Sequence, residues 1–242
     1  MSVDDSEKKS VVQGILLWDI DGTLVHKKKN PEYSRHLSAL GLPQFNSRYT
    51  ESEFSGLSDW DVLSIYAKRN GLAKEVVIKA FEVLNENADV KSGSELQPVP
   101  QVENILTQVN LKGWVNGILT GNTLGSAKVK LKEAELLDFF DISVFFCCQV
   151  EESRIDIVRR AKNLVSTATS RVIIVGDTVH DVYAAKENGL QVICVPNASQ
   201  NLDNILKLGP DKVIETLDMD PQRFLAVLEE VKKRKTETST FS

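Results

Sequence analysis

The 242-residue sequence has little of what marks several specialised classes of protein. Its 3 cysteines, 7 prolines and 13 glycines are too few for a disulfide-stapled, collagen-like or low-complexity chain. No apolar run approaches the roughly 18 residues that a membrane-spanning helix needs. Positive charge is not in excess, because 29 Lys and Arg stand against 34 Asp and Glu, a net charge of −5. These absences argue against a membrane protein and against a nucleic-acid binder, whose affinity would depend on a basic surface.

What is present is the composition of an ordinary globular protein, 42% hydrophobic and 26% charged. The length allows one large domain, or a core domain with a smaller insertion. The first ten residues, MSVDDSEKKS, are polar, and no long apolar stretch follows them, so we predict neither a signal peptide nor a transit peptide. Cys147, Cys148 and Cys194 lie in apolar segments without metal-ligand spacing and are expected to be reduced and buried. We therefore predict a cytoplasmic protein.

Apolar segments of strand length alternate with amphipathic helical segments along most of the chain. The apolar segments are Val11–Trp18, Trp114–Leu119, Ile142–Phe146, Val172–Val175 and Val192–Val195. Helical periodicity is found between them, for example in Ser126–Phe139 and Ile155–Val165. Wholly apolar strands that alternate with helices predict an α/β fold, a Rossmann-like doubly wound parallel sheet covered by helices on both faces.

The interval 26–98 interrupts this alternation. It has helical patterns at Tyr33–Leu40, Asp59–Asn70 and Glu75–Asn87, no convincing strand pattern, and a proline-bearing connector at its end, Gln97–Pro100. We therefore predict a helical insertion above the sheet, in a core formed by residues 11–25 and 99–231. Residues 1–10 and 232–242 are expected to be a flexible leader and a flexible tail.

Polar residues follow three of the predicted strands at the point where each strand ends. They are Asp19 and Asp21 after the first strand, Thr120, Gly121 and Asn122 after the second, and Asp177 and Asp181 after the fourth. In an open α/β sheet, ligands bind outside the carboxyl ends of the strands. We therefore expect all of these residues to face one crevice.

Four carboxylates in one crevice would raise each other's pKa values unless a cation neutralised them. Oxygen ligands without His or Cys favour a hard ion, and Mg²⁺ binds one or two carboxylates together with phosphate oxygens. The hydroxyl of Thr120 and the backbone amides of Gly121 and Asn122, near a helix start, suit an anion. Together these groups predict phosphoryl transfer, in which positioning and charge neutralisation supply most of the catalysis.

Three of these segments resemble, in order, the motifs of the haloacid dehalogenase superfamily. They are DIDGT at Asp19–Thr23, LTGN at Leu119–Asn122 and GDTVHD at Gly176–Asp181. The helical insertion lies where that family has its helical cap. The resemblance spans about residues 11–220 and is greatest to phosphoglycolate-phosphatase-like members. It implies a Rossmann-like core, an inserted α-helical cap and a Mg²⁺-dependent phosphatase activity.

The resemblance also implies a role for each motif residue. Asp19 is expected to be the nucleophile that forms an aspartyl-phosphate, and Asp21 the general acid and base. Family members that cleave carbon–halogen bonds lack the second Asp, so Asp21 favours phosphoryl transfer. Thr120 is expected to bind the transferring phosphoryl group, with help from Gly121 and Asn122.

The same resemblance implies a metal site. Mg²⁺ is expected to be held by Asp19, the backbone carbonyl of Asp21 and Asp177, with Asp181 as a ligand or as a partner of the ligands. The family usually places a Lys before the last acidic motif to balance the charge of the nucleophile and the phosphate. In this chain Arg154 is our candidate for that role, and Lys128 and Lys130 compete with it.

The segment EFSGLSD resembles the substrate-specificity turn of the family's cap, and its Gly56 and Asp59 are predicted to bind substrate. Relatives often have a basic residue just after the Gly, whereas Leu57 stands here. A strongly acidic substrate tail would therefore lose one partner, which argues against phosphoglycolate as the substrate.

The predicted function is hydrolysis of a small phosphorylated metabolite, by a monomer or homodimer with no nucleic-acid or membrane partner. Two alternatives stay open. One is a phosphomutase that acts on a sugar phosphate, since the same motif residues serve both reactions. The other is a catalytically silent binding or regulatory protein of the same fold, against which the presence of all four carboxylates and Thr120 argues.

Overall fold

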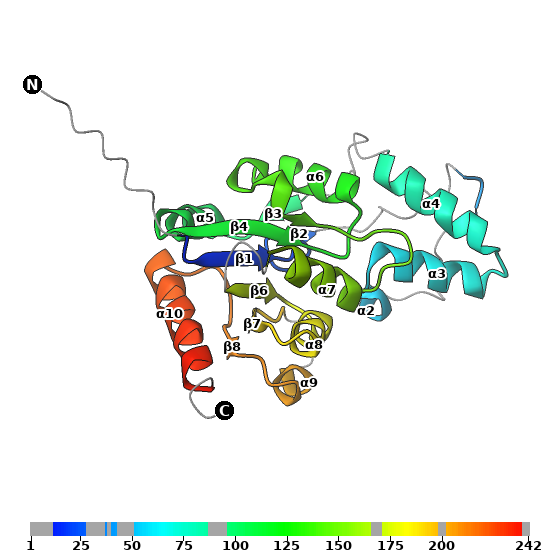
Figure 1. Ribbon diagram of the computed structural model, residues 1–242. Helices are drawn as coiled ribbons and strands as arrows, with labels where there is room; N and C mark the ends of the chain where they lie inside the picture. The colour runs from blue at the N-terminus through cyan, green and yellow to red at the C-terminus, as the bar shows by residue number, and fades with distance from the viewer. Residues whose placement is uncertain are drawn as a thin grey trace, which may run out of the picture.

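The computed structural model describes residues 12–27, 37, 40–42, 51–86, 96–165, 171–197 and 202–238. Within these residues, six strands form one sheet in the order β5-β4-β1-β6-β7-β8 (Figure 1). The strands are β5 (Phe145–Phe146), β4 (Trp114–Leu119), β1 (Gly14–Trp18), β6 (Val172–Gly176), β7 (Gln191–Cys194) and β8 (Lys212–Val213). Every neighbouring pair is parallel, which confirms the predicted Rossmann-like α/β fold.

Helices cover both faces of the sheet (Figure 1). One hydrophobic cluster includes α5 (Val102–Leu111), α10 (Pro221–Thr238) and part of α6 (Leu124–Glu133); the other includes α7 (Arg154–Val165), α8 (Val179–Glu187) and α9 (Leu202–Lys207). Residues of β1 alternate between the clusters, since Leu16 and Trp18 belong to the first and Ile15 and Leu17 to the second. The buried sheet of the prediction is therefore present.

Trp18, the last residue of β1, is fixed in the core by apolar and polar contacts. Its ring stacks on Phe224 with centroids 5.4 Å apart, and its indole N–H donates to Asn116 Oδ1 at 3.0 Å. Trp18 pairs with Ile118 of β4 and Val175 of β6, so the three strands end at nearly the same level. A rigid core residue thus immediately precedes Asp19.

Two of the predicted core elements are shorter than the sequence pattern indicated. The predicted strand Ile142–Phe146 is a 3₁₀ turn at Ile142–Val144 followed by the two-residue β5. Asp141 caps that turn by accepting the Ser143 N–H at 2.8 Å. The predicted helix Ser126–Phe139 ends as α6 at Glu133, because Glu135 adopts a left-handed φ of 58°, and a separate 3₁₀ turn follows at Leu137–Phe139.

Three helices of the interval 26–98 are described: α2 (Glu51–Phe54), α3 (Asp59–Arg69) and α4 (Lys74–Glu86). They lie beyond the end of the sheet to which the arrowhead of β1 points (Figure 1). Most of the predicted helix Tyr33–Leu40 lies outside the described residues. The helices predicted at Asp59–Asn70 and Glu75–Asn87 are present within one residue at each end.

The expectation that this interval has no strand was wrong. β2 (Val25–Lys27) and β3 (Leu96–Pro98) form an antiparallel pair at its two ends. Each strand has three residues, and neither has the apolar pattern of a buried strand. Because the two segments are far apart in the sequence, no local pattern indicates that they pair. The predicted flexible tail also begins too early, because α10 continues to Thr238.

No helix in the described parts of the chain is long and apolar enough to cross a membrane.

Candidate active site

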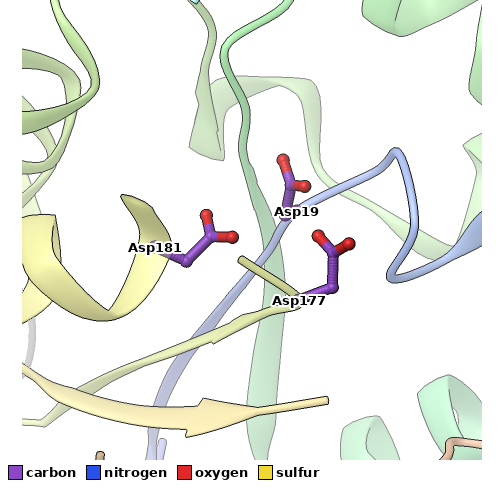
Figure 2. Close-up of side chains that lie close together, drawn as sticks. All are labelled: Asp19, Asp177 and Asp181. Carbon is purple, nitrogen blue, oxygen red and sulfur yellow. The ribbon is translucent and has the colours of Figure 1, made fainter. Parts of the chain in front are cut away.

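The carboxylates of Asp19, Asp177 and Asp181 lie together at the carboxyl end of the sheet (Figure 2). Asp19 directly follows β1, Asp177 directly follows β6, and Asp181 is in the first turn of α8. Each offers an oxygen within 4.8 Å of the others, and all three residues are buried. The neighbouring positions of β1 and β6 therefore bring together residues that are about 160 positions apart in the sequence.

Asp181 is held by the start of its own helix. Thr178 is the N-cap of α8, and its N–H and hydroxyl both donate to Asp181 Oδ2, at 2.9 and 2.8 Å. The other oxygen, Oδ1, pairs with Arg154. Gly176 has no room for a side chain, because an added Cβ would clash with the carboxyl group of Asp181. Both oxygens of Asp181 are thus already occupied by protein groups.

Arg154 reaches the predicted nucleophile. It is the first residue of α7 and is 6% exposed, and its Nη2 lies 2.9 Å from Asp19 Oδ1 while also pairing with Asp181. Burial alone would lower the pKa of this guanidinium, but Asp181 and Asp19 outweigh burial and raise its pKa. The residue therefore carries a fixed positive charge between two carboxylates.

Lys130, which competed with Arg154 in the prediction, also reaches the cluster. Its Nζ lies 2.7 Å from Asp21 Oδ2 and contacts Asn122 Oδ1, and the residue is 3% exposed. Lys128 has no hydrogen bond or ion pair to these carboxylates within the described ranges, although it is only two residues away on α6. The two cations thus divide the cluster, with Arg154 at Asp19 and Lys130 at Asp21.

The loop after β4 lies between Lys130 and Asp21 and contacts both residues through Asn122. Asn122 Nδ2 donates to Asp21 Oδ2 at 2.9 Å and to Thr120 Oγ1 at 3.1 Å, and the Asn122 N–H approaches the same hydroxyl at 3.3 Å. Thr120 is fully buried, and its N–H donates to the Phe146 carbonyl at 3.0 Å. The residues predicted to bind phosphate therefore lie beside the predicted acid and base.

The pKa values of the three central carboxyl groups are separated by their surroundings. Burial raises the pKa of Asp19 to about 6, a rise that Arg154 opposes and the charges of Asp181 and Asp21 reinforce. Burial, together with Asp181 and Asp19, raises the pKa of Asp177 well above its usual range. Burial would do the same at Asp181, but Arg154 and the bonds from Thr178 lower its pKa. Such repulsion is what a bound cation would relieve.

The donor set suits a hard cation. Asp177 Oδ1 is buried and has no hydrogen-bond partner within the described parts of the chain, whereas its Oδ2 accepts from Asn197 Nδ2 at 2.5 Å. Within the described ranges, the ligand atoms grouped here are the carboxylate oxygens of Asp19, Asp177 and Asp181, which fits Mg²⁺ better than a softer metal. The sequence prediction missed Asn197, although it comes three residues after the end of β7, at the edge where strand ends meet.

The predicted cap residues Gly56 and Asp59 lie against core loops that adjoin the carboxylate cluster, since Thr178 binds Asp181 and Asn122 binds Asp21. Gly56 has a φ of +79°, and a Cβ added there would lie 2.5 Å from Thr178 Oγ1. Asp59 is buried, and its Oδ2 accepts the Thr123 N–H at 2.7 Å. The structure therefore places both residues at a contact between the core loops and the segment 56–59, which leads into α3.

A parallel α/β sheet with buried carboxylates and two cations at its carboxyl edge defines a class of site suited to phosphate chemistry. The model of the family described as haloacid dehalogenase-like hydrolase matches residues 16–195. The chain belongs to the haloacid dehalogenase-like hydrolase family, as its motifs predicted. A search of curated proteins finds no match.

Solved structures of the same fold are similar over most of the chain. A haloacid dehalogenase-like family hydrolase from Streptococcus pneumoniae is 22% identical, with a TM-score of 0.62 over 90% of this chain and 98% of its own. CbbY from Rhodobacter sphaeroides, in complex with phosphate, is 18% identical, with a TM-score of 0.68 over 86% and 95%. A candidate β-phosphoglucomutase from Bacteroides vulgatus is 14% identical, with a TM-score of 0.65 over 93% and 92%. At these identities the likeness establishes the fold.

Proposed function

We propose that the protein is a Mg²⁺-dependent phosphatase that hydrolyses a small phosphorylated metabolite through an aspartyl-phosphate. The observation that carries the proposal is the buried Asp19 carboxylate, paired with Arg154 at 2.9 Å and adjacent to Asp177 and Asp181. A nucleophile, a fixed cation and oxygen ligands for a metal are the groups that phosphoryl transfer requires.

In the first step, an oxygen of Asp19 attacks the phosphorus of the substrate. The bond between phosphorus and the ester oxygen breaks, and its electron pair goes to the leaving oxygen. That oxygen takes the proton of the Asp21 carboxyl group and leaves as an alcohol. Arg154, beside the attacking oxygen, stabilises the negative charge on the phosphoryl group.

In the second step, the phosphoryl group leaves Asp19. A water molecule attacks phosphorus and gives its proton to the Asp21 carboxylate, and the bond between Asp19 and phosphorus breaks. Inorganic phosphate and the free Asp19 carboxylate are the products, and Asp21 is again protonated. Lys130 and Asn122 hold Asp21 Oδ2, at 2.7 and 2.9 Å, so the general acid and base has a fixed orientation.

Asp19, Asp177 and the backbone carbonyl of Asp21 would hold Mg²⁺, which supplies charge neutralisation for the phosphoryl group and the crowded carboxylates. Asp181 remains in the predicted ligand set. Its two occupied oxygens, however, favour the alternative that it acts on the site by holding Arg154.

Thr120, Gly121 and Asn122 are proposed to bind the phosphoryl oxygens, since they precede the N-terminus of α6. The helices between β2 and β3 are proposed to be the cap that covers the substrate. Leu57 stands where relatives often have a cation, so the proposed substrate has no strongly acidic tail. The remaining parts of the proposal are a cytoplasmic location and a monomer or homodimer with no nucleic-acid or membrane partner.

A phosphomutase that acts on a sugar phosphate is the second candidate. The contact of Gly56 and Asp59 with the core loops favours it, because a closed cap excludes the water that hydrolysis needs. The two candidates differ in product. Hydrolysis releases inorganic phosphate, whereas the mutase converts one sugar phosphate into its isomer without free phosphate.

The decisive experiment measures phosphate release from p-nitrophenyl phosphate and from a panel of phosphorylated metabolites, with and without Mg²⁺. Wild type is expected to release phosphate only with Mg²⁺, and Asp19→Asn to release none. A folded, metal-loaded wild type that neither releases phosphate nor isomerises a sugar phosphate would favour the catalytically silent alternative.

A further inference from the structure

A four-residue segment of the helical insertion, Gly56–Asp59, is docked on three loops of the core. Each of these loops follows a strand and carries residues of the candidate active site. The docking contacts are Gly56 against Thr178 after β6, Ser58 Oγ donating to the Glu152 carbonyl after β5 at 3.1 Å, and Asp59 N–H donating to the Gly121 carbonyl after β4 at 2.7 Å. One short segment thus contacts the loops that follow β4, β5 and β6.

Asp59 contacts the phosphate-binding loop at two points. Its backbone N–H donates to the Gly121 carbonyl at 2.7 Å, and its side-chain Oδ2 accepts the Thr123 N–H at the same distance. The two bonds bracket Asn122, which itself contacts Asp21. The position of Asp59 therefore affects the loop that orients the general acid.

Both bonds satisfy groups that a helix start leaves without partners. Thr123 is the N-cap of α6, and Asp59 is the first residue of α3, so neither N–H has a partner within its own helix. The carboxylate of Asp59 lies at the N-terminus of α6, where the helix dipole favours negative charge. The Thr123 N–H thus has its acceptor in Asp59, and the Asp59 N–H has its acceptor in Gly121. Both hydrogen bonds form only while the segment is docked.

The fit at this contact is close. A Cβ added to Gly121 would lie 2.7 Å from the Leu57 carbonyl oxygen and 2.9 Å from Ser58 Cα. Because these are backbone atoms, a side chain at position 121 would push the segment away from the loop. Docking therefore requires Gly121 on the core side and Asp59 on the insertion side.

We propose that Asp59 is a positioning residue that couples docking of the insertion to the geometry of the phosphate-binding loop. It acts on the reaction through Thr123 and Gly121 and does not bind substrate, contrary to the prediction from the motif. The expected effect on kcat rests on the proposed phosphatase function. The expected effect on docking rests only on the two hydrogen bonds of Asp59.

The kinetic test compares Asp59→Ala with Asp59→Asn on p-nitrophenyl phosphate. Removal of the acceptor is expected to lower kcat roughly 10- to 100-fold, because small displacements of a positioned group cost that much, with KM changed less than about threefold. Asn and Asp are comparable acceptors for a helix-start N–H, so Asp59→Asn is expected to keep kcat within about threefold of wild type. Glu75→Ala, an exposed carboxylate in the first turn of α4, is the control and should match wild type.

A second measurement follows docking without using activity. Trp60 is next to Asp59 and half-buried, whereas Trp18 and Trp114 are 0% and 3% exposed, so acrylamide quenching reports mainly on Trp60. Quenching is expected to increase in Asp59→Ala and in Gly121→Ala, and to stay at the wild-type level in Asp59→Asn and Glu75→Ala. Circular dichroism checks that each variant is folded.

Three outcomes would overturn the inference: Asp59→Ala with wild-type kcat, Asp59→Ala with wild-type quenching, or a KM that is raised about 10-fold or more in both Asp59→Ala and Asp59→Asn. The last would show that the charge itself contacts substrate. If wild type releases no phosphate, the proposed function fails, while the quenching difference between Asp59→Ala and Asp59→Asn still decides whether Asp59 holds the docked state.

Discussion

The two buried cations of the site, Arg154 and Lys130, pair with different carboxylates in different surroundings. Arg154 bridges two carboxylates, Asp19 and Asp181, whose side chains are 10% and 1% exposed. Lys130 pairs with one carboxylate, Asp21, whose side chain is 29% exposed, and shares it with the amide of Asn122. Asp19, the proposed nucleophile, is thus held in the drier half of the site, and Asp21, the proposed general acid, in the half that is more open to solvent. Electrostatic interactions are stronger in the drier half, because less water screens them.

The largest effect is expected at the two carboxylates themselves. Asp19→Asn removes the attacking oxygen's charge and should abolish phosphate release. Asp21→Asn removes only proton transfer and should lower kcat by roughly 10²- to 10⁴-fold. Rapid-quench experiments with a ³²P-labelled ester check this, since Asp21→Asn should retain some labelled protein and Asp19→Asn none. Labelled Asp19→Asn would assign the nucleophile to another residue.

The next effect separates the cations. Arg154→Met should lower kcat by roughly 10²- to 10³-fold for every phosphate ester, because the charge acts on the phosphoryl group. Lys130→Met should cost roughly 10-fold with p-nitrophenyl phosphate and roughly 100-fold with an alkyl phosphate, since only the poor leaving group needs a proton from Asp21.

Lys128→Met, two residues away on the same helix, is the control for Lys130→Met. Because loss of one partner of a buried ion pair costs about 3–5 kcal/mol, unfolding curves must accompany the kinetics. Equal losses on both esters for Lys130→Met would contradict the division of roles.

A smaller effect concerns metal and pH. In the metal-free chain, burial raises the pKa of Asp19 to about 6. Burial also raises the pKa of Asp177 well above its unfolded value. A carboxyl group with a raised pKa stabilises the folded protein at low pH, and for Asp19 this stability is lost as the pH rises through about 6. Mg²⁺ must displace the protons of both groups, so the increase in Tm that Mg²⁺ produces should be larger at pH 8 than at pH 5. Thermal unfolding with Mg²⁺ and with chelator measures this, and Asp177→Asn should remove most of the increase.

The smallest effect concerns the thiols near the Arg154 loop. Burial raises the pKa of Cys147 and Cys148 to about 12, and the Cys147 carbonyl accepts from Arg160 at 2.6 Å. Iodoacetamide at pH 8 should therefore leave both thiols unlabelled in native wild type and label them in urea, as mass spectrometry can show. Rapid labelling of native protein would mean that the Arg154 half of the site is more open than the structure indicates.

Much of the fold could be predicted because its strands are buried on both faces. The predicted segment Trp114–Leu119 coincides with β4. The predicted segment Val172–Val175 differs from β6 by one residue at its end. The prediction failed at β2 and β3, which have three residues each and form a separate antiparallel pair outside the main sheet. Periodicity reports burial, so elements that depend on long-range pairing give little local signal.

The sequence alone determined the family and the residue types of the site, because the strand-end motifs are local and their order is preserved along the chain. It could not decide between Arg154, which directly precedes a predicted helix, and Lys130, which lies in another predicted helix, because both are basic residues near a strand-end motif. Tertiary structure decided that both reach the cluster, each at a different carboxylate. It also decided that Asp59 faces Thr123 and that Asn197 faces Asp177. Distance and direction between segments far apart in sequence arise from packing of the sheet and helices, which no local pattern records.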